Sequence, residues 1–365
     1  MGSSATKEKD MRKLVLLGAG YGNMRILLRL LTKDLPSDIQ ITLVDRTPFH
    51  SVKTEFYALA AGTVPDSVIR VPLPVHDQLT FIEGEISEIN VEEKYVNLSD
   101  GQQLIYDEAV IGLGCRDNYH EVPGAAENTY SIQTIGKSRI TYEKLLGLGG
   151  GATVGIVGAG LSGIELASEL RETRPDLKIK LFDRSPRILR DFPERLSDYV
   201  QGWFDKHEVE VVAESNITKV GSDVLYNHEE TIPVDAVVWT AGIRPVTTVL
   251  TINTEKGDSG RLVLNKHHQL PTFNDVYVVG DCAELPYAPS AQVAEAQAEQ
   301  IVKVLRHVWN DEALPETMPE IKLKGFLGSL GKKQGFAYLG DRTVTGRIAR
   351  LMKSGVLWMY KWHNG

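Results

Sequence analysis

The sequence predicts an α/β protein built from two copies of one unit: a strand, a tight turn, a helix and a second strand. LVLLGAGYGNMRILLRL and the later ITLVDRTP resemble TVGIVGAGLSGIELASEL and the later IKLFDRSP. Each copy is followed by an apolar strand closed by glycine, EAVIGLG and DAVVWTAG. The strands LVLL and ITLV run apolar without alternation, which is typical of parallel strands buried on both faces. The shared order and similar spacing indicate a repeated βαβ unit.

The glycine-rich turn of each copy predicts a phosphate-binding site. Its first glycine permits a tight turn and its second lets the backbone approach a pyrophosphate, while the next helix presents free N–H groups with about half a unit of positive charge. The aspartate that ends the second strand accepts hydrogen bonds from ribose hydroxyls. The sequence therefore predicts two Rossmann-like dinucleotide-binding domains. The predicted ligands are Gly18, Gly20, Gly22 and Asp45 in the first copy and Gly158, Gly160, Gly163 and Asp183 in the second.

The two turns differ at their last position. GAGYGN has Asn23 where GAGLSG has Gly163. The third glycine of this fingerprint serves close packing of helix on strand more than phosphate contact. We therefore expect Asn23 to loosen that packing without removing the cofactor, and Gly22 to share the task.

The acid of the second copy predicts the kind of pyridine nucleotide. The carboxylate of Asp183 would repel the 2′-phosphate of NADPH, so it favours NADH. Arg184 and Arg187 follow closely and weaken that preference.

A later segment, TFNDVYVVGDCAEL, predicts a flavin. It has a short apolar strand that ends in Gly280 and Asp281. In this arrangement the carboxylate reaches the ribityl chain of FAD. The helix that follows from Ser290 then points its N-terminal amides at the isoalloxazine ring.

Composition places the chain among ordinary globular proteins. It has 365 residues, of which 42% are hydrophobic and 24% charged, which suits two domains. With a net charge of −8 and no long basic run, it is not expected to bind nucleic acid. Cys115 and Cys282 form no CxxC pattern, which argues against a disulfide framework and any metal site and favours a reducing compartment. The polar residues 1–10 predict a disordered lead and a cytoplasmic protein.

The motifs together resemble one flavoprotein family, the two-dinucleotide-binding-domain enzymes, and within it the type II NADH dehydrogenases. The resemblance implies an FAD domain over 11–115 and 246–325, an inserted NADH domain over 116–245, and a C-terminal segment over 326–365. The motifs that carry it are GAGYG, VDRTPFH, KTEFYALAAGT, GAGLSGIELASEL, WTAGIRP, VVGDCAEL, AQVAEAQ and GSLGKKQG.

The resemblance also implies further cofactor contacts and excludes some chemistry. SVKTEFYALAAGT has no cysteine, whereas disulfide-reducing relatives carry a redox pair there. Cys115 and Cys282 are not placed as sulfide:quinone oxidoreductases require, and Cys282 is expected to be a buried structural residue. The further predicted cofactor contacts are Arg46, Thr54, Ile86, Gly114, Gly280, Asp281, Ala291 and Val293 for FAD and Gly242 for NADH.

The implied reaction passes hydride from NADH to FAD and then two electrons to an acceptor. Glu165 matches a family glutamate near the nicotinamide, and the alternative is a solvated acid favoured by the helix dipole. Gln292 is the second predicted catalytic residue, from the segment that lines the quinone tunnel. That segment, AQVAEAQ, has Ala296 where the family has glutamine, which leaves the acceptor open.

Three functions therefore remain open from the sequence. The first is a peripheral NADH:quinone oxidoreductase at the cytoplasmic face of the membrane. The second is a soluble NADH oxidoreductase whose acceptor is a protein, oxygen or a small molecule, and the third is an NADH-sensing flavoprotein with slow turnover. The tail GRIARLMKSGVLWMYKWHNG mixes basic and aromatic residues as membrane-surface helices do. It would otherwise pack on the FAD domain or on the partner in a homodimer.

Overall fold

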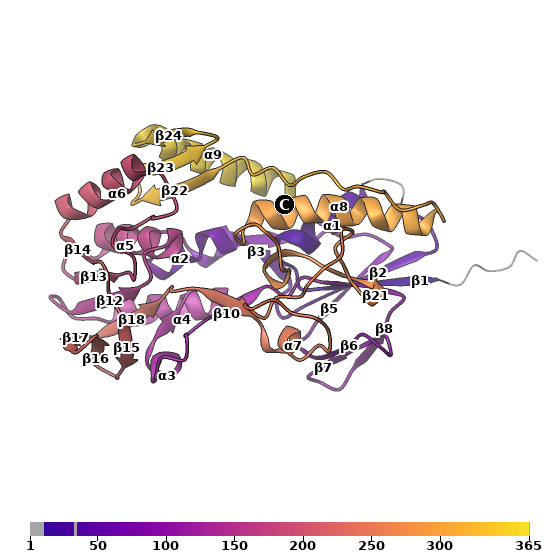
Figure 1. The fold of residues 1–365 in the computed structure, drawn as a ribbon, viewed down its shortest axis with the longest axis horizontal. Helices are drawn as coiled ribbons and strands as arrows, with labels where there is room; N and C mark the ends of the chain where they lie inside the picture. The colour runs from indigo at the N-terminus through magenta and orange to yellow at the C-terminus, as the bar shows by residue number, and fades with distance from the viewer. Residues whose placement is uncertain (1–10, 33–34, 365) are drawn as a thin grey trace, which may run out of the picture.

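The computed structural model of the chain describes residues 11–32 and 35–364 (Figure 1). The predicted disordered lead, residues 1–10, lies outside the described residues. Two parallel-stranded sheets lie toward opposite ends of the molecule, with helices packed against them, and a small third unit lies along one side. The predicted α/β class is therefore confirmed.

The first sheet has six strands in the order β20-β21-β9-β1-β2-β5, and only β20 runs antiparallel to its neighbour. Apolar side chains of the sheet are buried against two helices on one face and against a three-stranded sheet with a short helix on the other. Both faces are thus covered, which explains the continuous apolar strands. The strands are β20 (Gln269–Leu270), β21 (Phe273–Val278), β9 (Glu108–Ile111), β1 (Arg12–Leu17), β2 (Ile39–Asp45) and β5 (Leu79–Glu83). The covering elements are α1 (Tyr21–Leu31) and α8 (Ala291–Trp309), then β6 (Ile86–Asn90), β7 (Tyr95–Leu98), β8 (Gln103–Ile105) and α7 (Thr247–Leu250).

The second sheet has five strands, all parallel, in the order β11-β18-β12-β13-β14. Three longer helices bury apolar side chains on one face, and a three-stranded antiparallel sheet with one short helix covers the other. The strands are β11 (Tyr130–Ser131), β18 (Ala236–Trp239), β12 (Thr153–Val157), β13 (Lys178–Phe182) and β14 (Val209–Val212). The other elements are α3 (Ala125–Asn128), α4 (Ile135–Leu146), α5 (Leu161–Thr173), α6 (Glu194–Lys206), β15 (Ile217–Val220), β16 (Val224–Asn227) and β17 (Glu230–Pro233).

Two adjacent crossings connect the sheets. β10 (Cys115–Asp117) leaves the first sheet and β19 (Ile243–Pro245) returns to it, and the two strands pair antiparallel. Because the chain leaves and re-enters at the same place, the second Rossmann-like domain is inserted into the first. The elements between the sheets are β3 (Phe49–Ser51), η1 (Lys53–Glu55), α2 (Phe56–Ala60), η2 (Asp66–Ile69), β4 (Arg70–Pro72) and η3 (Gly280–Cys282).

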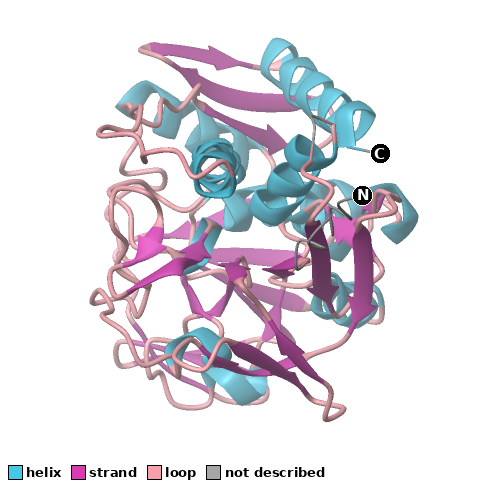
Figure 2. Ribbon diagram, turned by 90° about the vertical axis from the view of Figure 1, so that its right-hand side faces the viewer, coloured by secondary structure: helices cyan, strands magenta, loops and turns pink. Residues whose placement is uncertain are grey.

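The C-terminal unit is a small sheet with one long helix. β22 (Phe326–Leu330), β23 (Gln334–Leu339) and β24 (Arg342–Thr345) form an antiparallel sheet that packs against α5 and α6. α9 (Arg347–Asn364) lies along this sheet and runs toward the first domain (Figures 1 and 2). Among the described residues, none of the helices is long and apolar enough to span a bilayer.

Candidate functional site

The first glycine-rich turn forms an open end for α1. Gly18 has φ +91°, and a Cβ there would lie 2.7 Å from the carbonyl oxygen of Gly112, so another residue would be strained and crowded. α1 begins after Gly20 with no side-chain cap and no acid in its first turn. The first N–H groups of the helix therefore remain available to an anion, which fits a pyrophosphate.

The second turn has the same construction and borders a cavity of about 580 Å³. Gly158 has φ +108°, and a Cβ there would lie 2.7 Å from the Cα of Ala241. The space around Gly160 is open, and α5 begins after it with no side-chain cap. Gly242 lines the cavity and also has a positive φ, +104°. The cavity therefore reaches the uncapped end of α5, as a dinucleotide site requires.

The acid of each copy is fastened to its turn in the same way. One oxygen of Asp45 accepts from the backbone N–H of Ala19 at 2.7 Å, and the other accepts from that of Thr47 at 2.9 Å. Asp183 accepts from the N–H of Ala159 and of Ser185, both at 2.8 Å. Each carboxylate thus stands beside its glycine turn, where ribose hydroxyls can use its remaining lone pairs.

The expected loosening at Asn23 is wrong. Asn23 is fully buried, and its Nδ2 donates to the carbonyl oxygens of Leu17 and Gly18, both at 2.8 Å. The amide therefore ties α1 to the end of β1. Close approach of the helix to the sheet comes at Gly22 instead, where a Cβ would lie 2.4 Å from Cγ2 of Val279.

Asp281 joins two residues that the sequence analysis did not place with it. Its Oδ2 accepts from Cys115 Sγ at 3.0 Å and lies 3.4 Å from Lys53 Nζ. Burial raises the pKa of Cys115 to about 12, so this cysteine is a thiol at neutral pH. Burial acts to lower the pKa of Lys53, but Asp281 and Cys115 together outweigh it and hold that pKa above its ordinary value. The predicted flavin ligand is therefore a carboxylate paired with an ammonium.

Three other predicted FAD contacts, Thr54, Val293 and Gly114, take part in local hydrogen bonds. Thr54 hydroxyl lies 3.0 Å from the hydroxyl of Tyr21, and Ser290 caps α8 by accepting from Val293 N–H at 3.3 Å. Cys282 is fully buried, and its Sγ donates to the carbonyl oxygen of Gly114 at 3.2 Å.

Four more of the predicted FAD contacts lie in different surroundings. Ile86 is buried in the core of the first domain, and Arg46 lies 4.0 Å from Glu85 at the surface. Ala291 opens α8, and Gly280 donates its N–H to the side-chain oxygen of Gln297 at 2.9 Å.

Glu165 lies at the junction of the two domains and the tail. It is 6% exposed, forms an ion pair with Lys353 of α9, and accepts from Ser329 N–H at 2.9 Å. Burial raises the pKa of Glu165, and the ammonium of Lys353 opposes that effect. Lys353 also donates to the hydroxyl of Tyr57 at 2.5 Å and lies 3.6 Å from Glu55. The buried ammonium of Lys353 therefore lies close to two carboxylates. Because Glu165 is buried, it is not a solvated acid that is stabilised only by the helix dipole.

Lys353 is a residue of the tail whose surroundings the sequence does not predict. The mixture of basic and aromatic residues in the tail indicates an exposed position for it, yet its side chain is 5% exposed. The available signal was its spacing from Ala349 and Leu357, which puts it on the helix face that packs inward.

Both polar atoms of the Gln292 side chain form hydrogen bonds with backbone groups. Its Nε2 donates to the carbonyl oxygen of Gly325 at 2.6 Å, and its Oε1 accepts from Lys324 N–H at 2.9 Å. The amide therefore fastens the segment that leads into β22 onto the start of α8.

α9 also reaches the first turn. The hydroxyl of Tyr360 lies 2.8 Å from His50 Nε2, and His50 Nδ1 lies 2.6 Å from the carbonyl oxygen of Ala19. Burial lowers the pKa of His50, so the ring is neutral, with Nδ1 donating to Ala19 and Nε2 accepting from Tyr360. The ring of Tyr21 packs on both partners at 5.0 and 5.2 Å between centroids. One helix thus contacts both halves of the site.

The outward face of α9 is apolar. Trp358 and Trp362 are 64% and 73% exposed, and their rings stack at 5.7 Å. From residue 351 to 362 the exposed side chains of this helix carry no charge. The exposed apolar side chains are Ile348, Leu351, Met352, Val356, Trp358, Met359 and Trp362.

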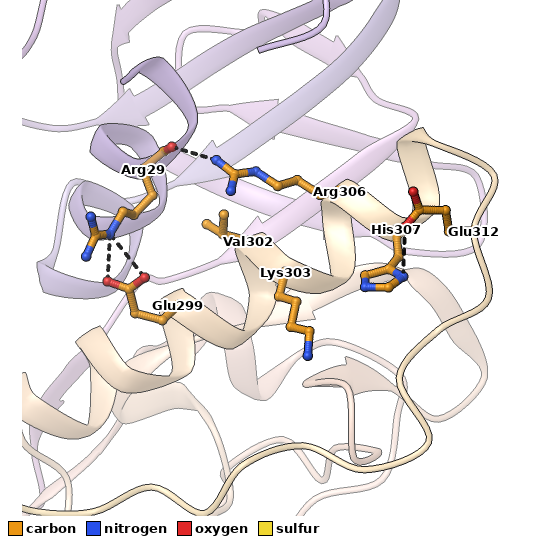
Figure 3. Close-up of a pocket in the computed structure, with 7 residues that line it drawn as sticks. All are labelled: Arg29, Glu299, Val302, Lys303, Arg306, His307 and Glu312. Carbon is orange, nitrogen blue, oxygen red and sulfur yellow. Dashed lines mark hydrogen bonds and ion pairs between the residues drawn. The ribbon is translucent and has the colours of Figure 1, made fainter. Parts of the chain in front are cut away.

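A separate surface pocket of about 330 Å³ lies on α1 and α8, away from the turns (Figure 3). Its charges are largely paired with one another. Arg29 Nε contacts Glu299 at 2.8 Å, and His307 Nδ1 lies 3.3 Å from Glu312. Figure 3 shows Lys303 pointing away from these pairs. The pocket therefore presents no concentrated charge of one sign.

Comparison with known proteins agrees with this geometry. The model of the pyridine nucleotide-disulphide oxidoreductase family matches residues 12–298. The chain is 60% identical over 355 residues to the NADH dehydrogenase-like protein YutJ of Bacillus subtilis, covering 97% of this chain and 100% of that protein. It is 24% identical to the type II NADH:quinone oxidoreductase of Staphylococcus saprophyticus, covering 94% of each.

Solved structures share the fold. The sulfide:quinone oxidoreductase of Aquifex aeolicus has a TM-score of 0.82 at 18% identity and covers 97% of this chain and 91% of its own. The NDH2 of Plasmodium falciparum in complex with NADH has a TM-score of 0.81 at 16% identity and covers 97% and 96%. The predictions of an oxidoreductase with FAD and NADH as cofactors are confirmed. The chain therefore belongs to the pyridine nucleotide-disulphide oxidoreductase family of flavoproteins.

Proposed function

We propose that this protein is a peripheral NADH:quinone oxidoreductase, with FAD at the first turn and NADH at the second. Bound FAD would take a hydride from NADH and release two electrons to a quinone. The observation that carries the quinone acceptor is α9, whose inner side chains contact both halves of the site while its outer face is apolar. A helix resting in a lipid surface would bring the first turn next to lipid-soluble molecules. The Staphylococcus relative named for quinone reduction supports the same acceptor.

The residues of each turn bind and orient their nucleotide. The backbone N–H groups at the starts of α1 and α5 would hold the two pyrophosphates, and Asp45 and Asp183 would accept from the adenosine riboses. Asp281, paired with Lys53, would accept from the ribityl chain of FAD. The N-terminus of α8, capped by Ser290, would supply positive partial charge to the flavin.

Glu165 would place a carboxyl group near the nicotinamide of bound NADH. Lys353 opposes the burial that raises the pKa of Glu165, and it holds the carboxyl group in one position, where it could accept a hydrogen bond from a carboxamide. Glu165→Gln should slow flavin reduction by NADH in a single turnover. An unchanged rate would remove Glu165 from the mechanism.

The membrane contact is tested by point variants in place of truncation, because truncation also removes Lys353. Trp358 and Trp362 lie on the outer face, whereas Tyr360 faces inward. The double variant Trp358→Gln, Trp362→Gln should lose flotation with liposomes, because interfacial binding scales with buried apolar area. Tyr360→Phe, the matched control, should float like the parent protein. Equal flotation of the double variant and the parent would end the membrane proposal.

The acceptor is tested by steady-state NADH oxidation with the FAD-loaded protein. A menaquinone or ubiquinone analogue should be reduced faster than oxygen, with ferricyanide as an acceptor that needs no quinone site. Loss of quinone reduction in the tryptophan double variant, with ferricyanide reduction kept, would tie the quinone to α9.

A second candidate acceptor is a protein, oxygen or another small molecule. It is favoured by Gln292, whose amide is occupied by Lys324 and Gly325, and by Ala296 in place of a tunnel glutamine. Brisk ferricyanide reduction without quinone reduction would select this candidate. A slow turnover with every acceptor and a long-lived reduced complex would select an NADH sensor.

A further inference from the structure

One wall of the cavity at the second turn comes from the linker between the two domains. Among the described residues that line this cavity, His120 is the one that precedes β12 in the chain, and the others lie within residues 157–242. His120 belongs to the crossing segment 118–122, which follows β10 and enters from the first domain. A histidine of the linker therefore borders the proposed nucleotide site.

Two hydrogen bonds hold the crossing segment on the end of β18. The N–H of Asn118 donates to the carbonyl oxygen of Gly242 at 3.0 Å, and His120 Nε2 lies 2.7 Å from the carbonyl oxygen of Ala241. Ala241 in turn packs on the glycine turn, since a Cβ at Gly158 would lie 2.7 Å from its Cα. The imidazole of His120 is therefore fixed beside the turn.

The backbone of the crossing segment is strained at the histidine. His120 has φ +49° and Glu121 has φ +59°, so two consecutive residues with side chains occupy the left-handed region. Such a conformation costs on the order of 1–3 kcal/mol and is most often found at ligand sites. A role of His120 in ligand binding would explain this strained arrangement.

The hydrogen bond to Ala241 decides which ring nitrogen of His120 is free. A carbonyl oxygen can only accept, so Nε2 carries the hydrogen. In the neutral ring Nδ1 is then an acceptor, and no donor among the described residues is bonded to it. The side chain is exposed at the cavity, so a ligand there has access to the ring. The neutral ring thus presents an acceptor, which suits a hydroxyl group better than a phosphate.

The strand order predicts which half of a dinucleotide meets this acceptor. β12 leads into the glycine turn, with β13 on one side of it and β18 on the other. Asp183, after β13, is placed for the adenosine ribose, and the turn is placed for the pyrophosphate. A dinucleotide that continues in the same direction across the carboxyl ends of the strands brings its nicotinamide ribose to the end of β18, where Ala241 and His120 lie.

The same direction leads toward the flavin site. The chain continues from β18 into β19, which pairs with β10 at the crossing between the domains. On β10, Cys115 contacts the predicted flavin ligand Asp281 at 3.0 Å. The crossing segment therefore starts from a strand that contacts the flavin site and lines the nucleotide cavity three residues later, at Asn118 to His120.

We propose that His120 is a binding residue for the nicotinamide ribose, whose hydroxyl donates a hydrogen bond to Nδ1. This bond holds the nicotinamide half of NADH at the end of β18, on the side that leads to the flavin. The inference rests on the proposed function in one respect, that the second turn is the pyridine nucleotide site.

The test is calorimetric titration of the FAD-loaded protein with NAD⁺ and with ADP. ADP contains the adenosine ribose and both phosphates but ends before the nicotinamide ribose, so it binds the turn without reaching His120. The variant His120→Phe keeps a ring and removes both nitrogens. It should weaken NAD⁺ binding by about three- to tenfold, as expected for one lost hydrogen bond, and change ADP binding by less than about twofold.

The matched control is His228→Phe. His228 has φ +52°, is exposed, and has its Nε2 at 2.9 Å from the carbonyl oxygen of Glu214, so it repeats the backbone and the ring contact of His120 outside the cavity lining. This variant should change neither affinity. His120→Gln, which retains a side-chain donor and acceptor, should recover part of the NAD⁺ affinity that His120→Phe loses.

The outcomes separate the inference from the proposed function. If His120→Phe weakens NAD⁺ and ADP equally, the residue supports only the turn and the inference is overturned. It is also overturned if His120→Phe binds NAD⁺ no less tightly than His228→Phe. In both cases the proposed function stands. A parent protein that does not bind NAD⁺ would overturn the proposed function and the inference together.

Discussion

The two glycine-rich turns have the same backbone geometry but place the polar side chain that supports it on different elements, the helix in the first turn and the closing strand in the second. In the first turn, Asn23 Nδ2 donates to the carbonyl oxygens of Leu17 and Gly18. In the second, the hydroxyl of Thr240 lies 2.9 and 2.8 Å from the oxygens of Val157 and Gly158.

The strand pairing shows that these are equivalent positions. Leu17 pairs with Ile111, and Val157 pairs with Trp239, so Gly112 in the first copy corresponds to Thr240 in the second. A Cβ at Gly112 would lie 2.6 Å from Asn23 Nδ2, and a Cβ at Gly163 would lie 2.8 Å from Thr240 Oγ1. The fold needs one polar side chain between helix and closing strand, and glycine opposite it. The missing third glycine is therefore one of two solutions to a single packing problem.

The C-terminal helix α9 contacts the two dinucleotide-binding domains through different kinds of interaction. It contacts the first turn through the neutral hydrogen bonds of His50 and Tyr360 and the second half through the ion pair of Lys353 and Glu165. Buried charge is more costly to disrupt than a neutral hydrogen bond. We therefore expect the two contacts to fail under different conditions.

The largest effects on cofactor binding should come from the first glycine of each turn. Gly18→Ala and Gly158→Ala each place a Cβ 2.7 Å from backbone atoms at a positive φ. Gly158→Ala should keep FAD but weaken NAD⁺ binding by at least about fivefold, since such strain costs about 1–3 kcal/mol. Gly18→Ala should lose FAD, measured as flavin absorbance per mole of protein. The opposite pattern, with flavin lost only in Gly158→Ala, would reverse the assignment of the turns.

Breaking the ion pair of Lys353 and Glu165 should have the largest effect on the free energy of unfolding. Lys353→Met leaves Glu165 and Glu55 buried without their cation and should lower the free energy of unfolding by about 3–5 kcal/mol. Lys361→Met, on the same helix but half-buried, is the control and should change it by less than about 1 kcal/mol. Urea unfolding measures both. Adding Glu165→Gln to Lys353→Met should recover part of the loss, and a Lys353→Met protein as stable as the control would show that the pair is unimportant.

Moving the polar side chain of the first turn from position 23 to position 112 should have an intermediate effect on the free energy of unfolding. Asn23→Gly removes the donor for two backbone carbonyls and should lower the free energy of unfolding by about 1–3 kcal/mol. Adding Gly112→Thr supplies the Thr240 arrangement and should recover part of it, although crowding against Val279 limits the gain. Gly112→Thr alone should destabilise through its clash with Asn23. If the double variant equals the sum of the single changes, the two positions do not share one role.

The smallest effect should be a pH dependence of the hydrogen bond between His50 and Tyr360. Because burial lowers the pKa of His50, the folded state favours the neutral ring. The resulting stability is fully present above the ordinary imidazole pKa of about 6.5 and is lost as the pH falls through the lowered value. Protonation also removes the acceptor for Tyr360. The protection factors of the amides in the last turns of α9, which correct for the intrinsic exchange rate at each pH, should therefore fall at acid pH. Tyr360→Phe should flatten this dependence, and an equal pH dependence in that variant would exclude the contact.

The repeat, the parallel sheets and the inserted domain could be predicted from the sequence because they follow from local patterns. The strands read as continuous apolar runs, and the turns have recognisable glycines. The compensation at Asn23 could not be predicted, because Thr240 and Gly112 meet the turns only through long-range strand pairing. The burial of Lys353 could not be predicted for the same reason: its partner Glu165 is far away in sequence, and a lysine on an amphipathic helix is usually exposed.

The most direct test of the central claim is anaerobic mixing of the FAD-loaded protein with NADH while the visible absorption of the flavin is followed. The assignment of FAD to the first turn and NADH to the second predicts bleaching at a rate that saturates with NADH. Gly158→Ala should keep its flavin, require much more NADH, and still bleach with dithionite. A parent protein whose flavin is reduced by dithionite but never by NADH would contradict the account.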